Sequence, residues 1–204
     1  MRRGFRLDKK VRKFRIWWYR AVLSENPECL RRATINQPTL ACGAGRISIG
    51  CDVAFGWRYS PFFYSGYSHL EARFPTARVE IGAGAFFNNS CTLIANTTYI
   101  KIGRDCRIGY CCSFFDSDFH GLHPSERDIP GDALPDAPVN IGDNVFLGSN
   151  VTVLKGVSIG HGSIIGAGSV VSKSIPPMTI AAGNPCRVIR QIADADRIHC
   201  AVRR

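Results

Sequence analysis

Residues 141–175 read IGDNVFLGSNVTVLKGVSIGHGSIIGAGSVVSKSI. Within this stretch an aliphatic residue recurs every six positions, at Ile141, Leu147, Val153, Ile159, Ile165 and Val171. A small or β-branched residue follows four places after each of them, at Val145, Val151, Val157, Ser163, Ser169 and Ile175. This period matches neither the turn of a helix nor the alternation of a strand. The stretch therefore predicts a solenoid of short, stacked units.

The same spacing is found upstream, where larger apolar residues occupy Ile81, Phe87, Leu93, Ile102, Ile108 and Phe114. Each is followed four places later by Ala85, Cys91, Thr97, Cys106, Cys112 or Asp118. Residues 49–56 are predicted to start the array, and residues 57–78 to form a degenerate coil. The array resembles the hexapeptide repeat of left-handed parallel β-helix acyltransferases. The resemblance implies an all-β fold in which three hexads make one triangular coil, with left-handed connections that depart from the usual right-handed rule.

The chain has 204 residues, 45% of them hydrophobic, which is enough for one solenoid domain with terminal additions. We expect a basic N-terminal segment at 1–40, a β-helix at 41–178 with a protruding loop at 115–138, and a C-terminal extension with a short helix at 179–204. Pro176 and Pro177 cannot donate to a strand ladder, so the prism is expected to end there.

Nothing in the sequence resembles a transmembrane span or a secretory leader, which favours the cytoplasm. The nine cysteines show no paired metal-ligand spacing. Cys91, Cys106 and Cys112 fall at the small inward position of the repeat. We therefore expect reduced, structural cysteines and no bound metal.

Residues 1–20 contain nine Lys or Arg and a single acid, Asp8. They also show the spacing of an amphipathic helix, with an apolar stripe at Leu7, Val11, Phe14, Trp18, Ala21 and Val22. One interpretation is a cap whose stripe covers the first coil and its open sheet edge. The other is an interfacial helix that touches an anionic inner membrane through Trp17, Trp18 and Tyr19. No second basic patch supports nucleic-acid binding.

The repeat is lost after Phe114 and resumes only at Ile141. A loop of this length inside a compact solenoid is more often functional than not. It contains two of the five histidines, His120 and His123. Acyl transfer from a thioester to a hydroxyl needs a base for the hydroxyl proton, and imidazole suits this role near neutral pH. We predict that His120 is this base.

The strings DSDFH at 116–120 and PVNIGDNVFLG at 138–148 resemble the catalytic loop and following coil of sugar O-acetyltransferases. These enzymes include the maltose, galactoside and nodulation-factor acetyltransferases and many that modify cell-surface polysaccharides. The resemblance implies that His120 is the general base. Asp116 or Asp118 could orient its imidazole, although Asp118 could equally be a corner residue of the prism, and His123 is treated as a loop residue.

The string FNNSCT at 87–92 supplies a second group of candidates. The resemblance implies that Asn88 lies near the acyl carbonyl, where its amide donates to the developing oxyanion or to the acceptor. Asn96 matches a position that contacts the acceptor and is often acidic in relatives, so this departure leaves the acceptor open.

The string AGNPCRVIR at 182–190 resembles the exit from the β-helix in the same family. The resemblance implies a coenzyme A groove beside it, in which Lys173, Arg187 and Arg190 bind phosphates, with Ser172 alongside. The backbone groups of Ser149 and Ala167, one coil apart, are candidates to pair with the pantetheine amides.

The sequence thus predicts an acetyl-CoA-dependent O-acetyltransferase for a saccharide hydroxyl, acting by direct transfer. The resemblance further implies a homotrimer whose sites combine residues of two chains. An N-acetyltransferase for an amino-sugar nucleotide and a xenobiotic acetyltransferase remain open alternatives. Less favoured are a metal lyase like the γ-carbonic anhydrases, because His69 and His161 do not match that spacing, and an inactive scaffold.

Overall fold

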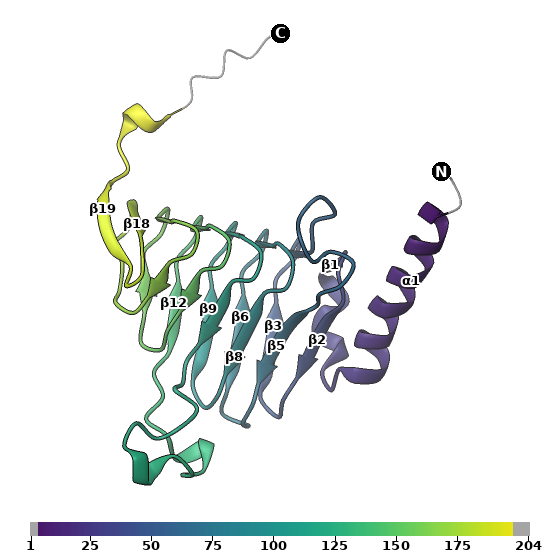
Figure 1. The fold of residues 1–204 in the computed structure, drawn as a ribbon, viewed down its shortest axis with the longest axis horizontal. Coiled ribbons are helices and arrows are strands. Elements are labelled where there is room, and N and C mark those ends of the chain that lie inside the picture. The colour runs from purple at the N-terminus through teal and green to yellow at the C-terminus, as the bar shows by residue number, and fades with distance from the viewer. Residues whose placement is uncertain (1–3, 198–204) are drawn as a thin grey trace.

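The computed structural model describes residues 4–197, which form a three-sided prism of parallel strands with α1 at its N-terminal end (Figure 1). Sheet A contains, in spatial order, β1 (Thr34–Ile35), β4 (Ala54–Phe55), β7 (Phe86–Phe87), β10 (Arg107–Ile108), β13 (Phe146–Leu147), β16 (Ile164–Ile165), β18 (Thr179–Ala182) and β19 (Arg187–Gln191). Sheet B contains β17 (Val170–Val171), β14 (Thr152–Val153), β11 (Ser113–Phe115), β8 (Thr92–Ala95), β5 (Ser68–Ala72) and β2 (Thr39–Cys42). Sheet C contains β15 (Ser158–Ile159), β12 (Val139–Ile141), β9 (Tyr99–Ile102), β6 (Arg78–Ile81) and β3 (Arg46–Ile49).

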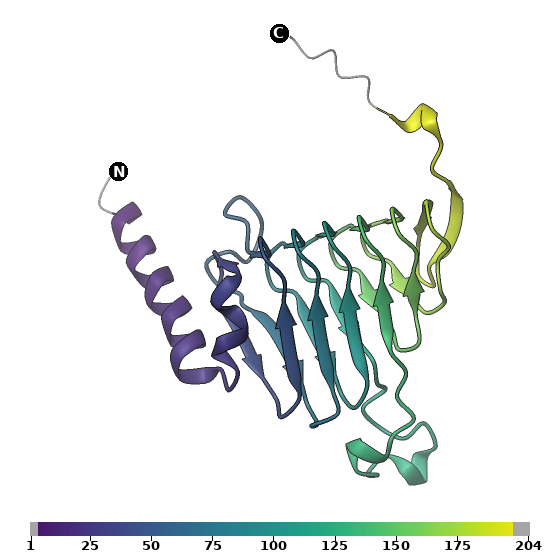
Figure 2. The ribbon, with the colours of Figure 1, turned by 180° about the vertical axis from the view of Figure 1, so that it is seen from behind.

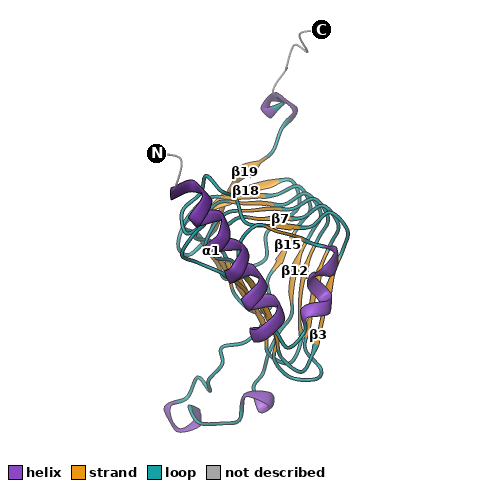
Figure 3. Ribbon diagram, turned by 90° about the vertical axis from the view of Figure 1, so that its right-hand side faces the viewer, coloured by secondary structure: helices purple, strands orange, loops and turns teal. Residues whose placement is uncertain are grey.

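Helical segments lie outside the prism. They are α1 (Gly4–Trp18), a π-turn at Tyr19–Leu23, and 3₁₀ helices at Pro27–Arg32, Pro124–Glu126, Gly131–Ala133 and Asp194–Asp196. Figure 3 looks along the prism and shows its three faces, with α1 crossing the near end. None of the helices in the described part of the chain is long and apolar enough to span a bilayer.

The strand register confirms the coil length that the repeat predicts. Ile141 pairs with Ile159, Leu147 with Ile165, and Val153 with Val171, each pair one coil of 18 residues apart. Stacked aliphatic residues thereby form ladders inside the prism, and all six are buried. The fold is the left-handed parallel β-helix expected for a hexapeptide array.

Aromatic rings and thiols complete this core. Phe55 and Phe87 stack with ring centroids 4.9 Å apart, and both are fully buried. Cys91, Cys106 and Cys112 are buried as expected, and the described cysteines are all free thiols. Burial raises the pKa of the Cys106 and Cys112 thiols to about 11, so these groups are protonated fillers of space and poor nucleophiles.

The ends of the prism differ from expectation. β1 and β2 already pair within the sheets, so the coils begin before residue 41. Pro176 and Pro177 do not end the prism, because they sit in a corner where no ladder donor is needed, and β18 then pairs with β16. The expected C-terminal helix is instead β19, antiparallel to β18, followed by a single 3₁₀ turn.

The helix α1 does not cover the first coil with its apolar stripe. Arg12 Nη1 donates to the Asn36 carbonyl (2.8 Å), and Arg15 Nη2 donates to the Ser65 carbonyl (3.0 Å), so the cationic side faces the prism. Phe14 and Trp17 are more than half exposed. The side chain of Leu7 lies outside the described residues. Figure 2 shows α1 standing off the end of the prism.

The open edge of sheet B is closed by the segment after α1. Ser24 Oγ accepts from the Ala41 amide (3.0 Å), and the Asn26 amide donates to the Ala41 carbonyl (3.1 Å). The Ala41 amide and carbonyl on the outer side of β2 have no partner strand. Ser24 and Asn26 satisfy them, whereas the apolar stripe of α1 does not.

Candidate active site

The loop between β11 and β12 projects from one corner of the prism, at the bottom of Figure 1. His120 lies exposed on it, with Nδ1 3.1 Å from the carbonyl oxygen of Arg127. A carbonyl oxygen only accepts hydrogen bonds, so in the neutral imidazole Nδ1 carries the proton. Nε2 then presents a lone pair, as a general base requires.

Neither candidate carboxylate orients this imidazole. Asp116 is fully buried and accepts from the Asn96 amide (2.6 Å), the Thr98 amide (2.9 Å) and the Thr98 hydroxyl (2.8 Å). Burial raises the pKa of Asp116 against the opposing effect of these hydrogen bonds. Its role is to fix the turn between β8 and β9.

Asp118 is also engaged elsewhere, since its Oδ2 lies 2.7 Å from Lys155 Nζ. Lys155 Nζ in turn donates to the Pro135 carbonyl (2.9 Å), which ties both ends of the loop to the next coil. The expectation of an orienting carboxylate is thereby corrected. A backbone carbonyl performs that task, and such a group leaves no trace in a pattern of side chains.

Asn96 is buried and does not face an acceptor site. Its Nδ2 donates to the Gly131 carbonyl (2.7 Å) and to Asp136 Oδ2 (2.8 Å), both on the returning part of the loop. Thr97 Oγ1 donates to the same carboxylate oxygen (2.7 Å). Asn96 therefore anchors the loop that carries His120, because both donors of its amide are used within the chain.

Asn88 follows β7 at the corner where the chain enters sheet B. Its Oδ1 accepts from the Asn89 amide (2.8 Å), an arrangement that leaves Nδ2 as the donor the site requires. Sequence reasoning missed the adjacent Asn89, which is buried and whose Nδ2 donates to three carbonyls, of which Pro61 is the nearest at 2.7 Å. Asn89 holds the aromatic loop 57–67 beside Asn88.

His120 and Asn88 lie at opposite ends of the strands of sheet B in one chain. The strands of this sheet are parallel; Asn88 precedes β8, whereas His120 lies beyond the end of β11. β8 has four residues, which span about 13 Å at the usual rise. A single chain therefore does not bring both groups to one reacting carbonyl.

The outer face of sheet B carries a shallow groove of about 460 Å³ next to this corner. It is lined by Gly66, Tyr67, His69, Glu71, Ser90, Thr92 and Ile94. Glu71 Oε2 lies 3.1 Å from His69 Nε2, and Arg73 Nε donates to Glu71 Oε1 (2.7 Å). Burial opposes ionisation of Glu71, but these bonds outweigh it and hold the pKa of its carboxyl below the ordinary value. The sequence analysis missed this groove; the alternation of polar residues at 69, 71 and 73 with apolar or small ones is the pattern that could have indicated it.

Two further contacts define the groove chemically. The Arg73 guanidinium lies over the Phe119 ring at 4.9 Å, which links the groove to the loop that carries His120. Cys42 joins His69 and Glu71 in a cluster whose potential ligand atoms lie within 4.8 Å of one another. A metal would need the Cys42 thiolate, but burial raises the pKa of this thiol to about 11, and Arg73 already neutralises Glu71. The cluster suits hydrogen bonding better than metal binding.

The residues that the sequence predicts to bind coenzyme A lie at the corner between sheets A and B near the C-terminus. The Ser149 carbonyl accepts from the Gly168 amide (2.9 Å), so this group is already used in the coil. Within the described residues the backbone N–H and C=O of Ala167 make no protein hydrogen bond, and the residue is exposed. Ala167 thus offers the amide pairing that an extended ligand needs.

The basic candidates fall into two groups. Lys173 and Arg187 are exposed, with Ser172 exposed beside Lys173, and the Cys186 amide donates to the Val170 carbonyl, which seats the Arg187 turn on β17. Arg190 instead forms two bonds with the Asp196 carboxylate (2.7 and 2.8 Å). This pairing raises the pKa of Arg190 and leaves fewer of its guanidinium donors for another anion.

Comparison with known proteins supports the fold and its repeat. The family model described as the hexapeptide repeat of succinyl-transferase matches residues 138–173. Galactoside O-acetyltransferase of Escherichia coli K12 is 58% identical over 121 residues, which cover 59% of this chain and 58% of that protein. The chain thus spans somewhat over half the length of the curated relative that it matches.

Two solved structures extend the similarity over most of the fold. A galactoside acetyltransferase in complex with coenzyme A has a TM-score of 0.52 and 26% identity, over 96% of this chain and 86% of that one. A maltose O-acetyltransferase from Clostridium difficile 630 has a TM-score of 0.54 and 26% identity, over 93% of this chain and 86% of that one.

Proposed function

Since the chain shares the hexapeptide repeat and the β-helix of the sugar O-acetyltransferases, we propose that it transfers an acetyl group from acetyl-CoA to a saccharide hydroxyl. The observation that carries this proposal is the hydrogen bond from His120 Nδ1 to the Arg127 carbonyl, because it leaves Nε2 of this exposed imidazole as the nitrogen with a free lone pair. The choice of a saccharide as acceptor follows the names of the galactoside and maltose acetyltransferases. Within that class we propose a cell-surface polysaccharide or its precursor, as the sequence resemblance implies.

Bound acetyl-CoA would supply the acyl group and the thiol leaving group. The exposed cations Lys173 and Arg187 fit its phosphates, and the unpaired backbone of Ala167 fits an amide of its pantetheine arm. His120 Nε2 takes the proton of the attacking hydroxyl and returns it to the departing sulfur. Asn88 Nδ2 donates to the carbonyl oxygen as negative charge develops there.

The groove on sheet B is the proposed acceptor site. It lies beside the Asn88 corner, and its carboxylate, imidazole and phenol are groups that bind sugar hydroxyls. The ring of Tyr67 is 40% exposed, enough to pack against a sugar ring. We propose that Glu71 and His69 select the acceptor, a role first assigned to Asn96.

We further propose that the active enzyme is a homotrimer with sites between chains. The separation of Asn88 and His120 within one chain supports this, since cyclic symmetry sets the loop of one copy against the sheet B corner of the next. The prediction is tested by complementation. His120→Ala and Asn88→Ala are each expected to be nearly inactive as pure proteins, whereas co-expressed chains should regain activity.

Random mixing in a trimer leaves about a quarter of the seams with both native groups, so roughly a quarter of native activity should return. Co-expression of His120→Ala with native chains, at the same total protein, serves as the control for mixing. If the two inactive variants regain nothing together while sedimentation shows mixed trimers, the site lies within one chain and the proposal fails.

Donor binding gives an independent prediction. Arg187→Ala should weaken acetyl-CoA binding by roughly tenfold or more, because a charge-assisted bond to phosphate is lost. Isothermal titration calorimetry measures this without knowledge of the acceptor. Arg190→Ala is the matched control and should change the affinity much less, since Asp196 already holds that guanidinium. Equal losses of acetyl-CoA affinity in the two variants would contradict the proposal that Arg187, and not Arg190, binds the phosphates.

A further inference from the structure

The described chain exposes much of its large apolar surface on two adjoining segments. On the helical segment at the N-terminus, the exposed side chains are Val11, Phe14, Trp17, Trp18, Val22 and Leu23. On loop 57–67 they are Trp57, Tyr59, Phe62, Tyr64 and Tyr67. Arg15 Nη2 joins the two segments by donating to the Ser65 and Gly66 carbonyls (3.0 and 3.2 Å). We call the surface formed by these two segments the end surface.

The rings on α1 form a continuous cluster. The centroids of Phe14 and Trp17 are 5.9 Å apart, those of Phe14 and Trp18 6.0 Å, and those of Trp17 and Trp18 6.2 Å. Arg12 and Arg15 lie on the other side of α1 from these rings and donate hydrogen bonds to the Asn36 and Ser65 carbonyls. The ring cluster therefore cannot turn toward the prism without breaking those bonds. An apolar cluster fixed outward marks an interaction surface.

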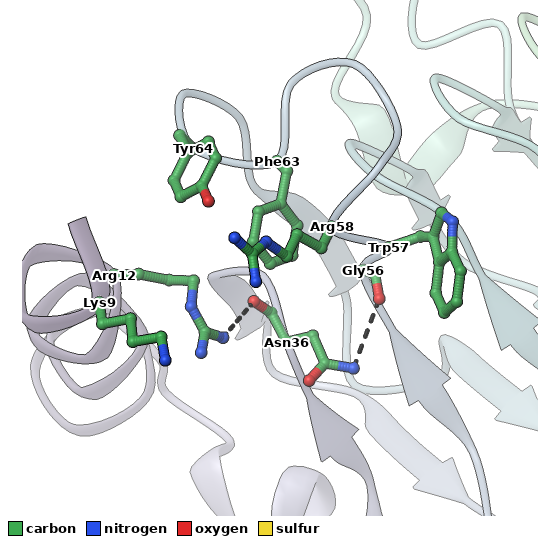
Figure 4. Close-up of a pocket in the computed structure, with 8 residues that line it drawn as sticks. All are labelled: Lys9, Arg12, Asn36, Gly56, Trp57, Arg58, Phe63 and Tyr64. Atoms are coloured by element: carbon green, nitrogen blue, oxygen red, sulfur yellow. Dashed lines mark hydrogen bonds between the residues drawn. The ribbon is translucent and has the colours of Figure 1, made fainter. Parts of the chain in front are cut away.

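A cationic cleft of about 210 Å³ lies between the two segments (Figure 4). Lys9 and Arg12 enter it from α1, and Arg58 enters it from the loop, while Phe63 and Tyr64 form part of its wall. Among the described residues that line it, none is acidic. The cleft has room for several water molecules and hence for a phosphate group.

The positive charge of the end surface favours an anionic bilayer over a second copy of the chain as its partner. Lys10 and Lys13 are also exposed on α1, in a segment (residues 1–20) with nine basic residues and one acid. A second copy would bring the same charges against these, at a cost in repulsion. An anionic bilayer instead offers phosphates for the cations and an interface in which tryptophan and phenylalanine rings are stable.

We propose that the end surface docks on an anionic lipid membrane, with the α1 rings in the interface and a lipid phosphate in the cleft of Lys9, Arg12 and Arg58. This arrangement would hold the enzyme at a membrane where glycans are assembled. The α1 rings and the cleft of Lys9, Arg12 and Arg58 include none of the groups assigned to acetyl transfer, although Gly66 and Tyr67 of loop 57–67 also line the proposed acceptor groove.

Vesicle flotation of the full chain tests the proposal. The protein should float with vesicles of equal parts phosphatidylcholine and phosphatidylglycerol, and should remain unbound with phosphatidylcholine alone. Trp17→Ala combined with Trp18→Ala should weaken binding more than tenfold, because two interfacial rings are lost. Lys9→Ala combined with Arg58→Ala should weaken it by roughly tenfold, and high salt should do the same to the native protein.

The matched control is Val188→Ala combined with Ile189→Ala, which removes exposed apolar groups from β19 at the far end of the prism and should leave flotation unchanged. Intrinsic fluorescence gives a second readout, because all three tryptophans of the chain, Trp17, Trp18 and Trp57, lie on the end surface. Their emission should shift to shorter wavelength with anionic vesicles only.

The proposal is overturned if the tryptophan variant floats like the native protein, or if the native protein floats equally well with and without phosphatidylglycerol in the vesicles. It is also overturned if sedimentation shows that the same tryptophans join two copies in solution. Acetyl-CoA binding, measured on the tryptophan variant and on the Lys9 and Arg58 variant, should stay unchanged, so failure of membrane docking is distinguishable from failure of the proposed enzyme function.

Discussion

Replacing His120 with alanine is expected to lower kcat/KM for acetyl transfer by about 10²-fold to 10⁴-fold, since this is what a general base usually contributes. The reason lies in the bond between Nδ1 and the Arg127 carbonyl, which leaves Nε2 unprotonated and free to accept the hydroxyl proton. Release of free thiol from acetyl-CoA in the presence of the acceptor measures the rate.

His120→Asn sharpens this test, because an asparagine amide is able to donate to the Arg127 carbonyl but offers no base. It should be as inactive as His120→Ala while acetyl-CoA affinity stays native. His123→Ala is the matched control, since His123 contacts Ser125 within the same loop. It should retain activity to within about twofold. Retention of more than a tenth of native kcat/KM by His120→Ala would remove the base assignment.

Replacing Phe87 with alanine is expected to destabilise the protein by about 3–5 kcal/mol. Phe87 is fully buried and stacks on Phe55 at 4.9 Å, so the truncation leaves a cavity in the middle of the prism. Urea unfolding at one fixed protein concentration measures the loss, because the stability of an oligomer depends on concentration.

The neighbouring Phe86 is the control for this substitution. It lies on the same strand but points outward, where its ring and that of Trp57 are nearly perpendicular at a centroid distance of 6.2 Å. Phe86→Ala should cost less than about 1 kcal/mol. Similar losses for the two variants would contradict the inward and outward assignment of the repeat.

The proposed roles belong to different parts of the prism. The C-terminal corner presents Ala167 and Arg187 for the donor, the outer face of sheet B presents Glu71 and His69 for the acceptor, and α1 occupies the N-terminal end. Docking of that end on a membrane would leave the donor corner at the other end of the prism exposed to solvent. The enzyme would then exchange acetyl-CoA freely while it remained close to lipid-linked glycans.

The repeat by itself determined the coil. A residue such as Leu147 faces inward because the hexad places every sixth side chain on the same face, and this local rule also set the pairing of Leu147 with Ile165. The break in the repeat likewise located the loop, and the resemblance carried by residues 116–120 led to the proposal of His120 as the base. These features follow from residues close together along the chain.

Tertiary structure decided everything that depends on partners far away in sequence. Hydropathy showed that α1 has two faces, but the contacts of Arg12 and Arg15 with distant carbonyls determine which one meets the prism. Asn96 was assigned to the acceptor, yet its amide is consumed by Gly131 and Asp136. A residue's type states which bonds it is able to make; the folded chain decides which of them it has left to offer.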